Sequence, residues 1–112
     1  MLRRGEIYIV SFDPARGFEQ GGVRPALVIQ NDEGNEFAST TIVAAMSSQH
    51  REYPVRVMVS PVQSGLRESS SVMLDQIRTI SQARLGRKVG QLTPDGMAEV
   101  DDALRRSLGL LY

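Results

Sequence analysis

Short apolar runs alternate with turn-forming residues over the first three quarters of the chain, a pattern typical of a mainly β protein. These runs are rich in β-branched and aromatic side chains, which favour strands. The first run ends at Asp13-Pro14, because proline cannot donate a ladder hydrogen bond. The pattern predicts strands at residues 6–12, 25–30, 40–46 and 55–60, and a fifth at 72–74 and 77–80 that bends near Asp75 and Gln76.

Two connections carry strong turn signals. Residues 13–23 contain one proline and three glycines and predict a loop that is long for a small domain. Loops of that length are often functional or mobile. Residues 31–35, with the sequence Asn-Asp-Glu-Gly-Asn, predict a turn between the second and third strands.

The C-terminal fifth of the chain predicts a helix. Thr93 can cap it and Pro94 suits its first position, where the missing N–H costs nothing. Apolar residues then recur at spacings of three and four and form one stripe, consisting of Met97, Val100, Leu104, Leu108 and Leu111. Several short strands with one terminal helix predict a small, strongly curved sheet or barrel closed by that helix.

Composition narrows the classes of protein. The 112 residues allow one domain, residues 1–112, and a dimer would cover more apolar surface than so short a chain can bury alone. There are no cysteines and one histidine, which excludes disulfides and thiolate metal sites and disfavours a histidine-rich zinc site. No apolar run approaches the ~20 residues that cross a bilayer, and the N-terminus lacks the pattern of a signal peptide. We therefore expect no membrane association and a cytoplasmic location.

The 13 basic and 13 acidic residues cancel, so the protein lacks the strongly basic surface of a general nucleic-acid coat. Locally the balance fails, because the charged residues between Gln76 and Leu92 are all basic: Arg78, Arg84, Arg87 and Lys88. Twelve of the 13 basic residues are arginine. A compositional bias of the source genome explains this better than selection for RNA contact.

No standard phosphate-binding, zinc-protease or serine-hydrolase motif is present. Arg24 stands where the glycine-rich loop enters a strand. Its guanidinium can hold a phosphate or, as spacing alone favours, pair with Glu19 or another carboxylate. Ser47 and Ser48 follow the third strand and either place a hydroxyl beside Arg24 or, more commonly, mark a strand end. His50 is the obvious general base by its pKa range, but its polar surroundings favour a solvated surface histidine.

Gln76 and Arg78 flank Ile77 and therefore point to the same face of a strand. They line either a groove or a solvent-exposed face, and the pattern alone does not separate the two.

One segment is more specific than any of these spacings: Gly17-Phe18-Glu19-Gln20-Gly21-Gly22-Val23-Arg24-Pro25. This segment resembles the MazF/PemK family of toxin endoribonucleases. The resemblance continues in the right order over essentially the whole chain, through residues 4–8, 13–14, 27–32, 41–45 and 75–80 and the closing segment with Leu104 and Leu108.

The resemblance implies a CcdB/MazF-type fold, which is a small SH3-like β-barrel with a C-terminal helix that works as a homodimer. It implies sequence-specific cleavage of single-stranded RNA without metal or other cofactor. In such a reaction the ribose 2′-hydroxyl attacks the adjacent phosphorus and leaves a 2′,3′-cyclic phosphate and a 5′-hydroxyl. It also implies neutralisation by a cognate MazE-like antitoxin.

The resemblance also implies roles for individual residues. Arg24 matches the family's catalytic arginine, and Ser47 matches a position that is usually threonine. Serine keeps the hydroxyl but loses the methyl that restricts χ1, and Ser48 can substitute if the register slips by one. Phe18, Glu19, Gln20, Gln76 and Arg78 are the residues expected to bind the RNA. Phe18 either stacks on a base or folds back onto the barrel.

Two other functions share this fold. A CcdB-like toxin binds DNA gyrase without chemistry and would not need Arg24 or Ser47. A degenerate member that only binds the antitoxin is compatible with serine at position 47, although an intact Arg24 argues against it. The segment from Glu19 to Pro25 favours the nuclease.

Overall fold

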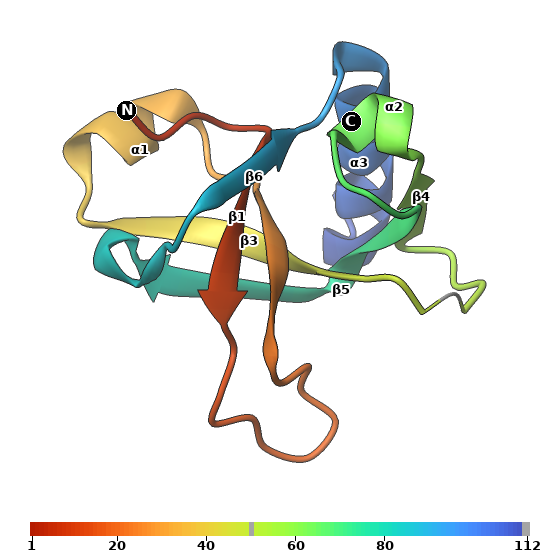
Figure 1. The fold of residues 1–112 in the computed structure, drawn as a ribbon, viewed down its shortest axis with the longest axis horizontal. Helices are drawn as coiled ribbons and strands as arrows, with labels where there is room; N and C mark the ends of the chain where they lie inside the picture. The colour runs from red at the N-terminus through yellow and green to blue at the C-terminus, as the bar shows by residue number, and fades with distance from the viewer. Residues whose placement is uncertain (50, 111–112) are drawn as a thin grey trace.

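The computed structural model describes residues 1–49 and 51–110. Helices and strands follow one another along the chain (Figure 1). They are β1 (Glu6–Ser11), β2 (Val23–Val28), α1 (Asp32–Phe37), β3 (Thr40–Ser47), β4 (Arg56–Val59), α2 (Pro61–Ser64), β5 (Ser70–Ser81), the 3-10 turn η1 (Gln82–Arg84), β6 (Lys88–Gln91) and α3 (Pro94–Leu108).

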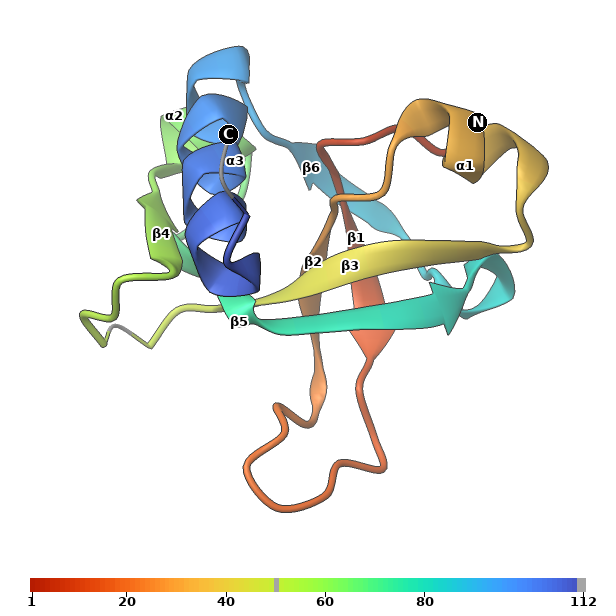
Figure 2. The same cartoon turned by 180° about the vertical axis from the view of Figure 1, so that it is seen from behind.

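The six strands form one antiparallel sheet in the order β4-β5-β3-β2-β1-β6. The sheet curls into a half-barrel, with β4 and β6 as its edges. Helix α3 packs against β4 and β5, and α2 packs against α3 and β6, so the two helices lie between the edges (Figure 2). The predicted mainly β fold with a C-terminal helix is confirmed, as an open half-barrel.

Apolar side chains pack on both faces of the sheet. One face, with Ile7, Leu27, Met46 and Leu74, packs against Val100 of α3. The other face carries a second apolar cluster, consisting of Val10, Phe12, Ala26, Val28, Val43, Ala45, Met73 and Ile80. Because successive side chains of a strand alternate between faces, the near-continuous apolar runs of β2 and β3 supply both clusters.

Strand β5 bends where the sequence predicted a bend. Ala44 pairs with Ile77 while Met46 pairs with Val72, so four residues of β5 oppose a single residue of β3. Such a bulge bends the strand and re-aims its side chains. The strand is nevertheless continuous over 12 residues, because other elements hold its bulged backbone: Leu74 N donates to Val55 O and Ser107 Oγ donates to Leu74 O.

Helix α3 begins as predicted, with Thr93 Oγ1 accepting from Gly96 N at 3.3 Å. Val100 is fully buried, but Leu108 is 51% exposed, so the apolar stripe leaves the core before the helix ends. Ala103 takes a buried place that the stripe did not include. Leu111 lies outside the described residues. No helix in the described part of the chain has both the length and the apolarity to span a bilayer.

Three short elements were not predicted: α2, η1 and β6. The turn expected at residues 31–35 is instead the start of α1, because the Asn31 side chain accepts from Gly34 N and caps the helix. The helix is fixed by Asn35, whose buried amide contacts Gln30 and Thr41. The second strand lies at 23–28 rather than 25–30.

A buried carboxylate ties β1 to β6. Glu6 is 7% exposed, and its two oxygens accept from Lys88 Nζ at 2.7 Å, Arg3 N at 2.7 Å and Tyr8 Oη at 3.0 Å. Burial opposes ionisation of Glu6, but the bonds from Lys88, Arg3 and Tyr8 outweigh it and lower the pKa of the carboxyl. Burial and the bond to Glu6 raise the pKa of Tyr8 to about 12, so the phenol stays a donor.

We expect Glu6→Gln to lower the free energy of unfolding by about 2 kcal/mol near neutral pH, because it removes a charged acceptor of several hydrogen bonds. The lowered pKa means that Glu6 stabilises the fold fully above its ordinary pKa of about 4.5 and less as the pH falls through the lowered value. The difference from wild type should therefore shrink on acidification, as measured by urea unfolding at several pH values. The exposed Glu99→Gln is the matched control, and a pH-independent difference would contradict the prediction.

Candidate active site

The ladder between β2 and β3 ends because of Pro25. Ile29 N donates to Ile42 O at 2.9 Å, and hydrogen-bonded pairs alternate along an antiparallel ladder. The next hydrogen-bonded pair after Ile29 and Ile42 is Leu27 with Ala44, and the one after that is Pro25 with Met46. Proline has no N–H to donate there, so the Met46 carbonyl has no ladder partner.

Arg24 supplies the donor that Pro25 lacks. Its Nη1 donates to Met46 O at 3.2 Å, and its Nε donates to Gly21 O at 2.9 Å. Gly22 takes a positive φ of 86°, and a Cβ there would lie 3.4 Å from Arg24 Nη2. A guanidinium has five N–H donors, so three stay available after these two bonds.

The spacing argument that favoured a pair between Arg24 and Glu19 or another carboxylate was wrong. The Glu19 carboxylate accepts from Arg16 N within the loop instead. Among the described residues, no carboxylate forms a salt bridge with Arg24. The two carbonyls orient the guanidinium without neutralising its charge.

Ser47 lies beside Arg24. The ladder pairs Ala26 with Ala45, and the same register continued by two residues sets Arg24 opposite Ser47. Opposite residues of an antiparallel pair point to the same face and lie about 5 Å apart. Ser47 Oγ accepts from Gln49 N at 3.1 Å. Ser48 comes after the end of β3 and is exposed.

Arg24 and Ser47 line one hollow of about 540 Å³ at the ends of β2 and β3, which we call the Arg24 hollow. No sequence motif predicted its opposite wall, which comes from the segment before β5 and includes Arg67 and Glu68. Glu68 is the one carboxylate among the described lining residues. The full lining is Gln20, Val23, Arg24, Pro25, Met46, Ser47, Ser48, Gln49, Leu66, Arg67, Glu68 and Ser70.

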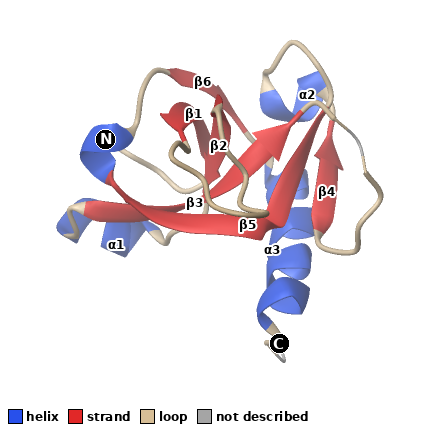
Figure 3. Ribbon diagram, turned by 90° about the horizontal axis from the view of Figure 1, so that it is seen from below, coloured by secondary structure: helices blue, strands red, loops and turns tan. Residues whose placement is uncertain are grey.

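A second hollow of about 320 Å³ lies between β5 and the β1–β2 loop, and we call it the loop hollow. Glu19, Gln76 and Arg78 line it, and Gln20 lines both hollows. The loop extends well below the sheet in Figure 1, and Figure 3, which views the molecule from below, looks onto its tip. Of the two alternatives for Gln76 and Arg78, the structure supports the groove.

Strand β5 holds this loop by its side chains. Gln76 Oε1 accepts from Gln20 N at 2.8 Å, and Gln76 Nε2 donates to Phe18 O at 3.3 Å. Arg78 donates to Phe12 O at 3.3 Å. The Phe18 ring is fully exposed and does not fold back onto the sheet. The loop therefore presents an unpaired aromatic ring from a backbone that β5 fixes.

The general base suggested by the sequence and the possibility of a metal site remain to be considered. His50 lies outside the described residues. Within residues 1–49 and 51–110, no three His, Asp or Glu side chains form a group that could hold a metal ion.

Residues 3–108 match the PemK-like, MazF-like toxins of type II toxin–antitoxin systems. The chain belongs to this toxin family. The match includes both hollows, since every residue that lines them lies between positions 3 and 108.

Solved structures of similar shape agree with the family. One of them is an endoribonuclease from a mycobacterial species, solved in complex with its cognate antitoxin. It matches this chain with a TM-score of 0.86 and 25% sequence identity, over 100% of this chain and 99% of that one. MazF from Deinococcus radiodurans has a TM-score of 0.84 and 28% identity, over 97% of each chain. A MazE–MazF complex from the same organism has a TM-score of 0.77 and 25% identity, over 98% of each chain.

The role of Pro25 can be tested by Pro25→Ala. The new N–H should bond to Met46 O, compete with Arg24 and be protected from hydrogen exchange, while the guanidinium N–H groups of Arg24 exchange faster. Unfolding free energy should change by less than about 1 kcal/mol, because the added hydrogen bond offsets the greater entropy of the unfolded chain. NMR exchange rates measure both effects. Pro54→Ala in an exposed turn is the control, and a new amide at position 25 that exchanges as fast as the one at 54 would contradict the argument.

Proposed function

We propose that this toxin is a sequence-specific endoribonuclease that cleaves single-stranded RNA in the cytoplasm without a metal ion. The observation that carries the proposal is the Arg24 guanidinium, held by two carbonyls beside Ser47 at the mouth of a hollow. The similar structures described as endoribonucleases support the same activity. A gyrase-binding function gains no support, because it has no use for this arrangement.

The substrate provides the nucleophile. Its ribose 2′-hydroxyl attacks the neighbouring phosphorus and loses its proton, and the 5′-oxygen leaves and gains one, which gives a 2′,3′-cyclic phosphate and a 5′-hydroxyl. The three remaining N–H donors of Arg24 stabilise the charge that builds on the phosphorane oxygens. The Ser47 hydroxyl donates to a phosphate oxygen, and the Glu68 carboxylate is available in the same hollow to accept the proton.

The loop hollow binds the nucleotides beside the cut. Glu19, Gln20 and Gln76 offer carboxylate and amide groups that can pair with base edges, and Arg78 can pair with a phosphate. Phe18 is exposed for stacking on an unpaired base. Because Gln20 borders both hollows, the loop links base recognition to the position of the scissile phosphate.

We propose that the toxin acts as a homodimer and is neutralised by a MazE-like antitoxin. The antitoxin partner is supported by the mycobacterial and Deinococcus complexes, which contain relatives at 25% identity over nearly the whole chain. A second copy would cover apolar side chains that one copy leaves exposed, such as Met58 and Leu110.

The activity test is incubation of the purified protein with a long single-stranded RNA in EDTA, followed by mapping of the ends. We expect fragments with 5′-hydroxyl and 2′,3′-cyclic phosphate ends at one recurrent sequence. Arg24→Ala should lower the cleavage rate by roughly 10²–10³-fold, as the loss of one preorganised donor does in other enzymes.

A contaminating nuclease is excluded if Arg24→Ala loses the activity while Arg105→Ala, on the far end of α3, retains it. Circular dichroism shows whether both variants keep the fold. Cleavage at full rate by Arg24→Ala would remove the basis of the proposal, as would 5′-phosphate ends.

Two substitutions of Ser47 test separately whether its hydroxyl is needed and whether the orientation of that hydroxyl matters. Ser47→Ala should lower kcat by roughly 10- to 100-fold, because a hydrogen bond to a charged phosphate is worth ~1.5–3 kcal/mol. Ser47→Thr keeps the hydroxyl and restricts χ1, so it should retain or raise kcat. Single-turnover rates on the mapped sequence give both values. An inactive Ser47→Thr together with an active Ser47→Ala would exclude a role for the hydroxyl.

A further inference from the structure

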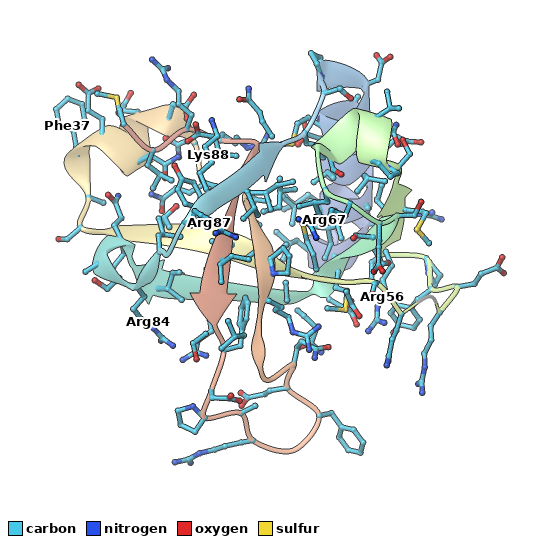
Figure 4. The ribbon with its side chains drawn as sticks, viewed as in Figure 1. Phe37, Arg56, Arg67, Arg84, Arg87 and Lys88 are labelled. Atoms are coloured by element: carbon cyan, nitrogen blue, oxygen red, sulfur yellow. The ribbon has the colours of Figure 1, made fainter. Side chains whose placement is uncertain are left out.

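Behind the Arg24 hollow lies a third concavity of about 400 Å³, which we call the basic groove. Arg67, Arg87 and Lys88 line it together with the apolar side chains of Ile9, Pro25, Leu66 and Val89 and with Gly65. No carboxylate belongs to this described lining. The three basic side chains come from two chain segments that lie across β1 and β2 from each other (Figure 4).

The walls of the groove are fixed by close backbone contacts. Gly86 N donates to Ile9 O at 2.8 Å, and a Cβ on Gly86 would lie 2.8 Å from that same oxygen. On the other side, a Cβ on Gly90 would overlap the Ser64 carbonyl oxygen at the end of α2. Only glycine permits both approaches. The backbone that carries Arg87 is therefore seated on β1, and α2, three residues before Arg67, is seated on β6.

Two of the three basic residues keep their charge unpaired. Lys88 Nζ is 2.7 Å from Glu6 Oε2, so the Glu6 carboxylate neutralises it. Arg67 and Arg87 are exposed, and neither has a carboxylate within salt-bridge distance among the described residues. The groove thus offers two guanidinium forks, each of which can bind a phosphate by two hydrogen bonds.

The basic groove is continuous with the Arg24 hollow. Pro25, Leu66 and Arg67 line both. Pro25 directly follows Arg24 and pairs with Ile9 of β1, and Ile9 N donates to Arg87 O at 3.0 Å. An anionic chain whose phosphate lies at Arg24 can therefore pass Arg67 and reach Arg87 without leaving the concave surface.

We propose that the basic groove binds the RNA phosphates that flank the cut on one side, with Arg67 and Arg87 as positioning residues. This inference rests on the proposed function, because the continuity with Arg24 is what favours RNA over an acidic peptide. Arg67 and Arg87 act on the length of RNA that is held, and Arg24 acts on the bond that is cut. A short RNA that fills only the Arg24 hollow does not reach Arg87.

The test compares wild type with Arg67→Gln/Arg87→Gln on two labelled RNAs of about 5 and about 15 nucleotides. Both carry the mapped cleavage sequence and a 2′-O-methyl group at the scissile ribose, so that binding is measured without cleavage. For the double variant, fluorescence anisotropy should show a roughly 10-fold weaker Kd on the longer RNA and a clearly smaller loss on the shorter one, which meets Arg67 in the Arg24 hollow but does not reach Arg87. The salt slope on the longer RNA should fall by about 1.4, which corresponds to two lost phosphate contacts on a single strand.

The matched control is Arg105→Gln/Arg106→Gln, which removes the same charge from α3 and should leave both Kd values unchanged. Arg67→Lys/Arg87→Lys keeps the charge and should restore part of the binding and the salt slope. Equal weakening on both RNAs, or none on either, would overturn the proposal. Unchanged RNA binding with weakened binding of an acidic antitoxin peptide would assign the groove to the peptide instead and would equally overturn it.

Failure of the proposed function has a separate signature. A wild-type protein that cleaves no RNA fails the activity test, and the same anisotropy comparison is then made with mixed-sequence RNAs of the two lengths. Loss of length-dependent binding in the double variant would still support the groove, and its absence would overturn the groove as well.

Discussion

A single missing hydrogen-bond donor organises the candidate active site. Pro25 stands where the register of β2 and β3 requires an N–H, and the Met46 carbonyl is left for another donor. Arg24, the residue next to that proline, fills the place with its side chain. An unpaired backbone carbonyl would carry a cost of about 1–3 kcal/mol if buried, so the same bond that satisfies the backbone also fixes the guanidinium. The adjacent Arg-Pro pair is in this sense one structural unit.

The acceptor that each arginine of this toxin bonds to determines whether its positive charge is neutralised. Arg24, Arg78 and Arg84 donate to backbone carbonyls, which orient a guanidinium without cancelling its charge. The carboxylates are used elsewhere, for example in the bidentate Asp75–Arg56 pair on the β4 edge and in the Asp101–Arg4 pair at 2.6 Å. A chain of zero net charge can therefore present uncompensated positive charge along the strand ends and in the basic groove.

The bulge in β5 connects the core to the β1–β2 loop. Its extra residues turn Gln76 toward the loop, where the amide bonds to the backbone at Phe18 and Gln20. The bulged backbone is in turn held by Ser107 of α3. The loop's position thus depends on the packing of a helix whose own residues line neither hollow. This explains why a loop with seven exposed residues in a row, 13–19, can still present Phe18 and Glu19 in a defined place.

Local sequence signals were sufficient to predict most of the helices and strands and one part of the site. Strand composition, the Thr93 cap and the glycine-rich loop are local signals, and each predicted its element to within two residues; the adjacency of Arg24 and Pro25 is likewise local. Short α1, α2 and β6 were missed because a few residues carry little intrinsic preference, and their stability comes from contacts such as Gly90 on Ser64 and Asn35 on Thr41. Only the tertiary structure placed Ser47 opposite Arg24, Gln76 beneath the loop and Arg67 across from Arg87. Strand register and bulges determine which side chains lie close together, and both are set by packing between strands that are far apart along the chain.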